Sequence, residues 1–127
     1  MEIITHQTID QILCGRPLEV EDGRSRVELA TLESMSADAS GLVHGGFIFG
    51  LADYAAMIAV NHPNVVLGAA DVKFLKPVRV GDTVIAEARV QEVQGKKLWV
   101  SVSVTLQDET VFQGMFTCFA LDRHIMS

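Results

Sequence analysis

The sequence has few residues of the kinds that build metal sites and disulfide frameworks. Its two cysteines, Cys14 and Cys118, form no motif, and its four histidines show no metal-ligand spacing with each other or with the cysteines. Zinc sites need such ligands at short, regular spacings. We therefore expect free thiols, no metal site and no disulfide.

Basic residues are also scarce. Ten Lys and Arg against 16 Asp and Glu give a net charge of −6, which disfavours nucleic-acid binding over the whole surface. The start, MEIITHQTID, lacks the positive region and apolar run of a secretory signal. The apolar run from Phe47 to Val60 is interrupted by Asp53 and is shorter than the ~20 residues of a membrane span. The expectation is a cytoplasmic protein that binds neither nucleic acid nor membrane.

Apolar residues, by contrast, make up 49% of the 127 residues, and no repeat, linker or low-complexity tract divides the chain. This favours a single domain over residues 1–127 with a core of its own. We predict its parts from local patterns. They are an N-terminal helical segment within 1–22, a first strand over 24–32, a central helix at 43–61 and a four-strand run over 65–121.

The central stretch, VHGGFIFGLADYAAMIAVN, is apolar almost all the way round, which predicts a helix buried on every side. The strands after it alternate; for example, Val84, Ala86 and Ala88 face one way while Glu87 and Arg89 face the other. A curved antiparallel sheet wrapped around one hydrophobic helix satisfies every element. Because one helix cannot cover both faces of a sheet, part of the sheet is expected to meet another copy.

One face of the predicted helix carries chemistry. At about 100° per residue, Gly46, Gly50 and Asp53 lie within roughly 60° of one another. Free N–H groups and the positive dipole end at the helix start favour an oxyanion, and the Asp53 carboxylate can act as base or nucleophile. Gly46 and Asp53 are about 10 Å apart along the axis, at 1.5 Å per residue. Two antiparallel helices in a homodimer would bring these groups together in a shared site.

The run His44-Gly45-Gly46-x-x-x-x-Leu51-Ala52-Asp53 resembles the signature of the hotdog-fold thioesterases, specifically the phenylacetic-acid-pathway (PaaI-like) type of acyl-CoA thioesterase. Phe74-Leu75-Lys76-Pro77-Val78, followed by Gly81-Asp82, is similar to the next segment of that family. The resemblance covers roughly residues 24–121. It implies an α+β hotdog fold, dimers that often pair into dimers of dimers, and no metal or prosthetic group, with coenzyme A present only as part of the substrate.

The resemblance also implies roles for the residues of the motif. Asp53 would attack the thioester or activate water, and the backbone N–H of Gly46, or of its neighbour Gly45, would polarise the thioester carbonyl in the other subunit's site. His44 would shape the turn. The chain departs from the family at Asp38, where an Asn is usual, and the strand after the helix offers no hydroxyl at 67–70.

Substrate contacts are predicted in two groups. The first is aromatic or large and apolar, and would line the acyl pocket: Phe47, Phe49, Tyr54, Met57 and Phe74. The second comes from a segment, 73–97, with six basic and three acidic residues, which could steer the phosphates of coenzyme A. Its members nearest the motif are Lys73, Lys76 and Arg79.

The resulting hypothesis is an acyl-CoA thioesterase that releases a free acid and coenzyme A. A non-catalytic acyl-CoA-binding protein is the first alternative, in which Asp53 is a structural acid. The second alternative is a hydroxyacyl- or enoyl-thioester dehydratase or hydratase. That reaction needs a His with a carboxylate as an acid–base pair, whereas His44 and Asp53 would lie on opposite faces of one helix.

Overall fold

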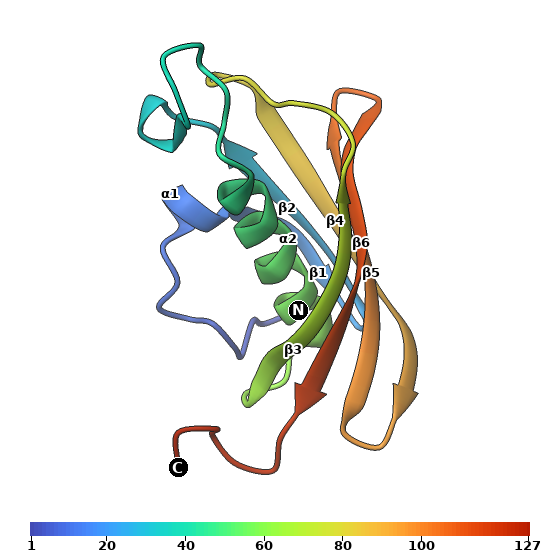
Figure 1. The fold of residues 1–127 in the computed structure, drawn as a ribbon. Coiled ribbons are helices and arrows are strands. Elements are labelled where there is room, and N and C mark those ends of the chain that lie inside the picture. The colour runs from blue at the N-terminus through green and yellow to red at the C-terminus, as the bar shows by residue number, and fades with distance from the viewer.

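The computed structural model describes all of residues 1–127, and its largest element is one antiparallel sheet of six strands. The strands run in the spatial order β1-β2-β4-β5-β6-β3. Their bounds are β1 Arg16–Glu21, β2 Arg24–Ala30, β3 Val65–Phe74, β4 Thr83–Gln94, β5 Lys97–Leu106 and β6 Glu109–Ala120. The sheet curves around a single long helix, α2, Gly45–Val60 (Figure 1). This arrangement is the hotdog fold, as predicted from the sequence.

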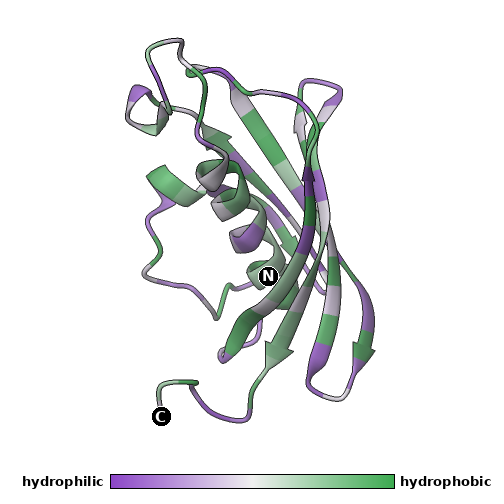
Figure 2. Cartoon of the chain, in the orientation of Figure 1, coloured by the Kyte–Doolittle hydropathy of each residue, from purple (hydrophilic) through white to green (hydrophobic).

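Helix α2 lies where its uniform apolarity predicts. Nine of its residues, among them Leu51, Ala55 and Ile58, are buried, and hydrophobic residues gather on the helix and on the strands behind it (Figure 2). The helix starts after His44 and ends at Asn61, whose left-handed backbone (φ 51°) stops the helical hydrogen bonding. The Asn61 side chain then binds the backbone of Glu2 and Ile4, which ties the N-terminus to this end of the helix.

The inner face of the sheet supplies the other half of the core. Val84, Ala86 and Ala88 of β4 are buried, and so are Val100, Val102 and Val104 of β5 and Phe112 and Phe116 of β6. The alternation seen in the sequence therefore marks the face that contacts α2. The helix also binds the sheet through a polar contact, since the Ser25 hydroxyl donates to the Ala55 carbonyl at 2.6 Å.

The N-terminal prediction was wrong in part. Only Gln11–Cys14 forms a helix, α1, which is capped by Asp10, and Arg16–Glu21 is a strand paired with β2. The missed signal is Asp22-Gly23, a dipeptide that favours a two-residue hairpin turn, where Gly23 has φ +77°. Pro17 fits this strand, because proline is tolerated near the start of an edge strand.

One glycine of the sheet is needed for close packing. A Cβ at Gly114 of β6 would lie 2.6 Å from the Asp71 carbonyl and 2.6 Å from Val72 Cγ1, both on β3. We expect Gly114→Ala to destabilise the protein by about 1–3 kcal/mol, because the added methyl pushes β3 away from β6. Urea unfolding of the variant beside wild type checks this. An unchanged midpoint would show that β3 tolerates the shift.

Candidate active site

The first turn of α2 presents two free backbone donors. The Phe47 N–H donates to the His44 carbonyl at 3.0 Å, and the His44 N–H donates to the Met35 carbonyl at 2.9 Å. The N–H groups of Gly45 and Gly46 form no hydrogen bond within the chain, as expected for the first positions of a helix. Together with the positive end of the helix dipole, they can bind an oxygen that carries negative charge.

A side chain at either position would press on a neighbouring ring. A Cβ at Gly45 would lie 3.1 Å from Phe74 Cε1, so the Phe74 ring sits directly against the start of the helix. A Cβ at Gly46 would lie 3.0 Å from the His44 ring. His44 caps the helix by its extended backbone and makes no side-chain capping hydrogen bond. Its ring lies edge-on to Phe47, with centroids 6.2 Å apart, which agrees with a role in shaping the turn.

Asp53 lies in the middle of α2 and is half-buried. Its Oδ1 atom is buried and has no hydrogen-bond partner. Burial raises the pKa of the Asp53 carboxyl from its ordinary value of 3.8 to about 6, because the charged form loses hydration and gains no partner. A carboxylate with such a pKa holds and releases a proton close to neutral pH, which suits a general base.

Two thiols lie near Asp53, and sequence analysis gave them no role. Burial raises the pKa of Cys14, with smaller contributions from the charges of Asp10 and Asp53. Burial, followed by the charge of Asp53, raises the pKa of Cys118 to about 12. The raised pKa values keep both thiols in the neutral form, and since a thiol never carries positive charge, Asp53 gains no cationic partner from them. No short-range sequence pattern could have found this cluster, because its members come from α1, α2 and β6.

The face of α2 that carries Asp53 is partly uncovered. A Cβ at Gly50 would meet no atom within 4 Å, so nothing within the chain requires a glycine there. Glycine inside a helix costs about 1 kcal/mol relative to alanine. No contact within the chain accounts for a glycine at this position.

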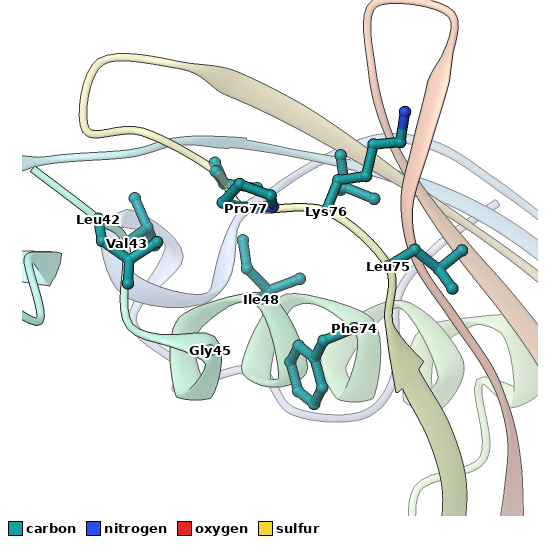
Figure 3. Close-up of a pocket in the computed structure, with 10 residues that line it drawn as sticks. Leu42, Val43, Gly45, Ile48, Phe74, Leu75, Lys76 and Pro77 are labelled. Atoms are coloured by element: carbon teal, nitrogen blue, oxygen red, sulfur yellow. The ribbon is translucent and has the colours of Figure 1, made fainter.

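A mostly apolar pocket of about 350 Å³ lies beside the start of α2 (Figure 3). Gly45 contributes to its wall. Its other lining residues include Leu42, Val43, Ile48, Phe74, Pro77 and Val78. Of the residues predicted to contact substrate, Phe74 and Lys76 line this pocket. Sequence analysis did not include the aliphatic residues of the lining among the site residues, although Leu75, Pro77 and Val78 belong to the second motif.

The other predicted acyl contacts lie elsewhere. Tyr54 and Met57 are 2% and 1% exposed and belong to the core in the single chain, not to the pocket. Phe47 and Phe49 are half-buried, and the Phe49 ring packs against Phe116 with centroids 5.5 Å apart.

The six basic residues of 73–97 do not form one patch. Lys73, Lys76 and Arg79 are exposed near the start of α2, whereas Lys96 and Lys97 lie in the β4–β5 hairpin at the opposite end of the sheet (Figure 1). The reason is that β4 runs the full length of the sheet between them. Lys76 is also paired with Glu109, at 3.0 Å. Arg89, the sixth, lies within β4 opposite Arg24 of β2. Of the six, Lys73 and Arg79 thus lie beside the candidate site without an ion-pair partner, and Lys76 lies there paired.

Within the single chain, Asp38 has no effect on Asp53. It is exposed and accepts hydrogen bonds from the backbone and the hydroxyl of Ser40, and these bonds lower its pKa. The raised pKa of Asp53 is caused by burial alone. In addition, no three His, Cys, Asp or Glu side chains are placed to hold a metal ion, and no helix has the length and apolarity needed to cross a membrane.

A curved sheet around one helix, with a carboxylate inside that helix and free N–H groups at its start, defines a hotdog protein with polar groups on its central helix. The model of the thioesterase superfamily matches residues 40–113, more than half of the chain. The chain therefore belongs to the thioesterase superfamily.

Curated relatives share this domain within longer proteins. A methylthioribose-1-phosphate isomerase from Aquifex aeolicus is 57% identical over 123 residues, which are 96% of this chain and 27% of that protein. The transcription factor FapR from a Thermoanaerobacter species is 29% identical over 113 residues, 88% of this chain and 56% of its own length. The chain thus spans between about a quarter and about half of these relatives.

Solved structures match the fold closely. An uncharacterized protein, PH1136, from Pyrococcus horikoshii is 50% identical, with a TM-score of 0.99 over 100% of this chain and 98% of that chain. A mutant of the phenylacetic acid degradation protein PaaI from Thermus thermophilus is 25% identical, with a TM-score of 0.80 over 86% of this chain and 95% of that one.

The unpaired carboxylate makes a prediction about stability. Because the pKa of Asp53 is higher in the folded chain (about 6) than its ordinary value of 3.8, the unfolded state binds fewer protons between these values, and stability falls as pH rises from about 4 to 6. Asp53→Asn should therefore raise the free energy of unfolding by about 1–3 kcal/mol at pH 8, and hardly at all at pH 4.

Urea unfolding at the two pH values measures this difference. Asp22→Asn is the matched control, since Asp22 is exposed in the β1–β2 turn and Asn-Gly suits that turn as well as Asp-Gly. A gain of equal size at both pH values would contradict the argument, because it would not depend on ionisation.

Proposed function

We propose that this chain is an acyl-CoA thioesterase, which hydrolyses a thioester of coenzyme A to a free acid and the thiol. One observation carries the proposal: the same helix holds a half-buried carboxylate without a hydrogen-bond partner, Asp53, and the free N–H groups of Gly45 and Gly46. Natural proteins retain such an unsatisfied buried acid chiefly where it has a function.

The reaction needs only these groups. As a general base, ionised Asp53 takes a proton from a water molecule while the oxygen of that water attacks the thioester carbonyl. As a nucleophile, Asp53 itself attacks, and water then hydrolyses the anhydride. In either case the carbonyl oxygen becomes negative and is stabilised by the Gly46 N–H, aided by that of Gly45. The C–S bond breaks, the acid is released, and the departing thiolate gains a proton. No metal or prosthetic group takes part in this proposal.

The site is proposed to be shared between two copies of the chain. Asp53 lies too far along α2 from Gly46, about 10 Å at 1.5 Å per residue, for both to reach one carbonyl. The long edge strand β3 leaves one side without a partner, and its residues 68–71 are exposed. Antiparallel pairing of β3 with its copy would continue the sheet, cover this edge and set the two α2 helices antiparallel. The open face at Gly50 leaves room for this approach.

Several finer assignments belong to the same proposal. A PaaI type of thioesterase is supported by the likeness to the Thermus protein and by the spacing of His44-Gly45-Gly46 to Asp53. Lys73, Lys76 and Arg79 are proposed to attract the phosphates of coenzyme A, since they are exposed near the start of α2. We further propose a cytoplasmic protein in which such dimers pair into tetramers.

A second candidate is an acyl-CoA-binding protein without turnover. One observation favours it: the same domain makes up 56% of a transcription factor, so the fold also occurs in proteins that carry a regulatory name. In that case the pocket would bind the thioester, and Asp53 would not be needed for chemistry.

The direct test is release of free thiol from a panel of acyl- and aryl-CoAs. Wild type should hydrolyse at least one class, and Asp53→Asn should lower kcat/KM about 10²–10⁴-fold, with an unchanged circular dichroism spectrum. Asp22→Asn should retain full activity. Turnover by wild type should rise between about pH 5 and pH 7, as the carboxyl with a pKa of about 6 ionises. Binding of acyl-CoA without any thiol release would favour the second candidate instead.

Complementation tests the shared site. Gly46→Pro removes one N–H in the first turn, where proline is tolerated in a helix, and should lower activity about 10²–10³-fold. When Gly46→Pro and Asp53→Asn are denatured together and refolded at equal amounts, about half of random dimers are mixed, and each has one intact site. Activity should then recover to about a quarter of wild type. If the two variants stay inactive after they are refolded together, the shared site is refuted. A wild-type protein that sediments as a monomer would refute it as well.

A further inference from the structure

The pocket beside the start of α2 has a preformed floor. Its deepest residues, Val43, Ile48, Val78 and Val111, are 2–4% exposed. Backbone hydrogen bonds hold its walls together: Val43 N–H donates to the Val78 carbonyl at 2.9 Å, and Leu75 N–H donates to the Val111 carbonyl at 2.8 Å. The volume, about 350 Å³, lies within the range of small-molecule sites.

The side chains of the lining offer almost nothing to a polar ligand. Apart from Lys76, no side chain of the lining carries a nitrogen or oxygen atom. The Lys76 amine points away from the pocket (Figure 3) and is paired with Glu109 at 3.0 Å. Gly45 also belongs to the lining, and its N–H at the start of α2 is free to bind a ligand.

We propose that this pocket holds the acyl part of the substrate, and that the preferred acyl group is apolar and carries no hydroxyl or carboxylate; the inference rests on the thioesterase activity proposed above. With the thioester carbonyl at the start of α2, the chain on its carbon side enters the pocket. A hydroxyl or a carboxylate buried there would lose its hydration and find no partner.

The same reasoning places the pantetheine arm of coenzyme A outside this pocket. The pantetheine portion carries two amide groups, and each would lose hydrogen bonds to water inside this lining. The apolar pocket therefore fits the acyl group better than the arm. The arm would then leave towards the exposed basic residues Lys73 and Arg79.

Substrate preference is the first measurement. We would determine kcat/KM for straight-chain acyl-CoAs of increasing length, each matched with a 3-hydroxyacyl-CoA and an acyl-CoA ending in a carboxylate. The expected result is a loss of about tenfold or more for the hydroxyl and a larger loss for the carboxylate. Equal rates for the polar and apolar members of each pair would overturn the proposal while leaving the thioesterase activity intact.

Two variants change the pocket in opposite directions. Ile48→Ala deepens the floor and should move the preference towards longer or bulkier acyl groups. Leu42→Trp, at the rim where Leu42 is 38% exposed, should move it towards shorter ones without disturbing the core. Val93→Trp, on the exposed end of β4, is the matched control and should leave the preference unchanged.

Measurements of acyl-CoA binding distinguish failure of this inference from failure of the proposed thioesterase activity. Calorimetry with Asp53→Asn should show acyl-CoA affinity that rises with chain length and that falls for long chains when Leu42→Trp is added. Hydrolysis by wild type with a preference that neither pocket variant alters would overturn the pocket assignment alone. If Leu42→Trp changed the oligomeric mass in solution without changing the acyl preference, the pocket would be a contact surface for a second copy of the chain. Absence of both binding and hydrolysis would overturn both proposals.

Discussion

The burial of one helix inside a curved sheet is the constraint on which the other features depend. The inner face of β4 and β5 is built from small and branched residues such as Ala86, Ala88 and Val102, so α2 can approach the sheet closely. Close approach buries the helix along its length, and the single carboxylate on it becomes half-buried without a partner. The raised pKa of Asp53 thus follows from the packing that stabilises the fold.

Two positions on this helix reduce stability without a reason inside the chain. Ionised Asp53 lacks a partner, and Gly50 stands in mid-helix where an alanine would meet nothing. Departures from local rules of this kind concentrate at functional sites. Both share one face of the helix with the exposed Gly46. A second body that approaches this face, whether a copy of the chain or a substrate, accounts for both positions at once.

Local patterns predicted the helix and the last four strands, because uniform apolarity and alternation are properties of neighbouring residues. The start of α2 and the carboxylate also lie on one short motif. The pocket could not be predicted, since it joins Leu42 and Ile48 to Val78 and Val111, which meet only after the sheet forms. The prediction of one basic patch over 73–97 was wrong for the same reason: residues close in sequence lie at opposite ends of one long strand, β4. The strand β1 was missed because it is short and exposed.

The division of roles between pocket and carboxylate bears on how one fold serves different proteins. The domain is shared with proteins named as an isomerase and as a transcription factor, so the sheet and helix alone do not decide the function. In the proposed site, an apolar pocket beside free N–H donors would be enough to bind a thioester, and binding needs no base. Hydrolysis adds one requirement, a carboxylate that reaches the carbonyl. In this chain that carboxylate is present and half-buried, and it has no hydrogen-bond partner that would account for it as a structural residue. The balance of these observations favours catalysis over binding alone.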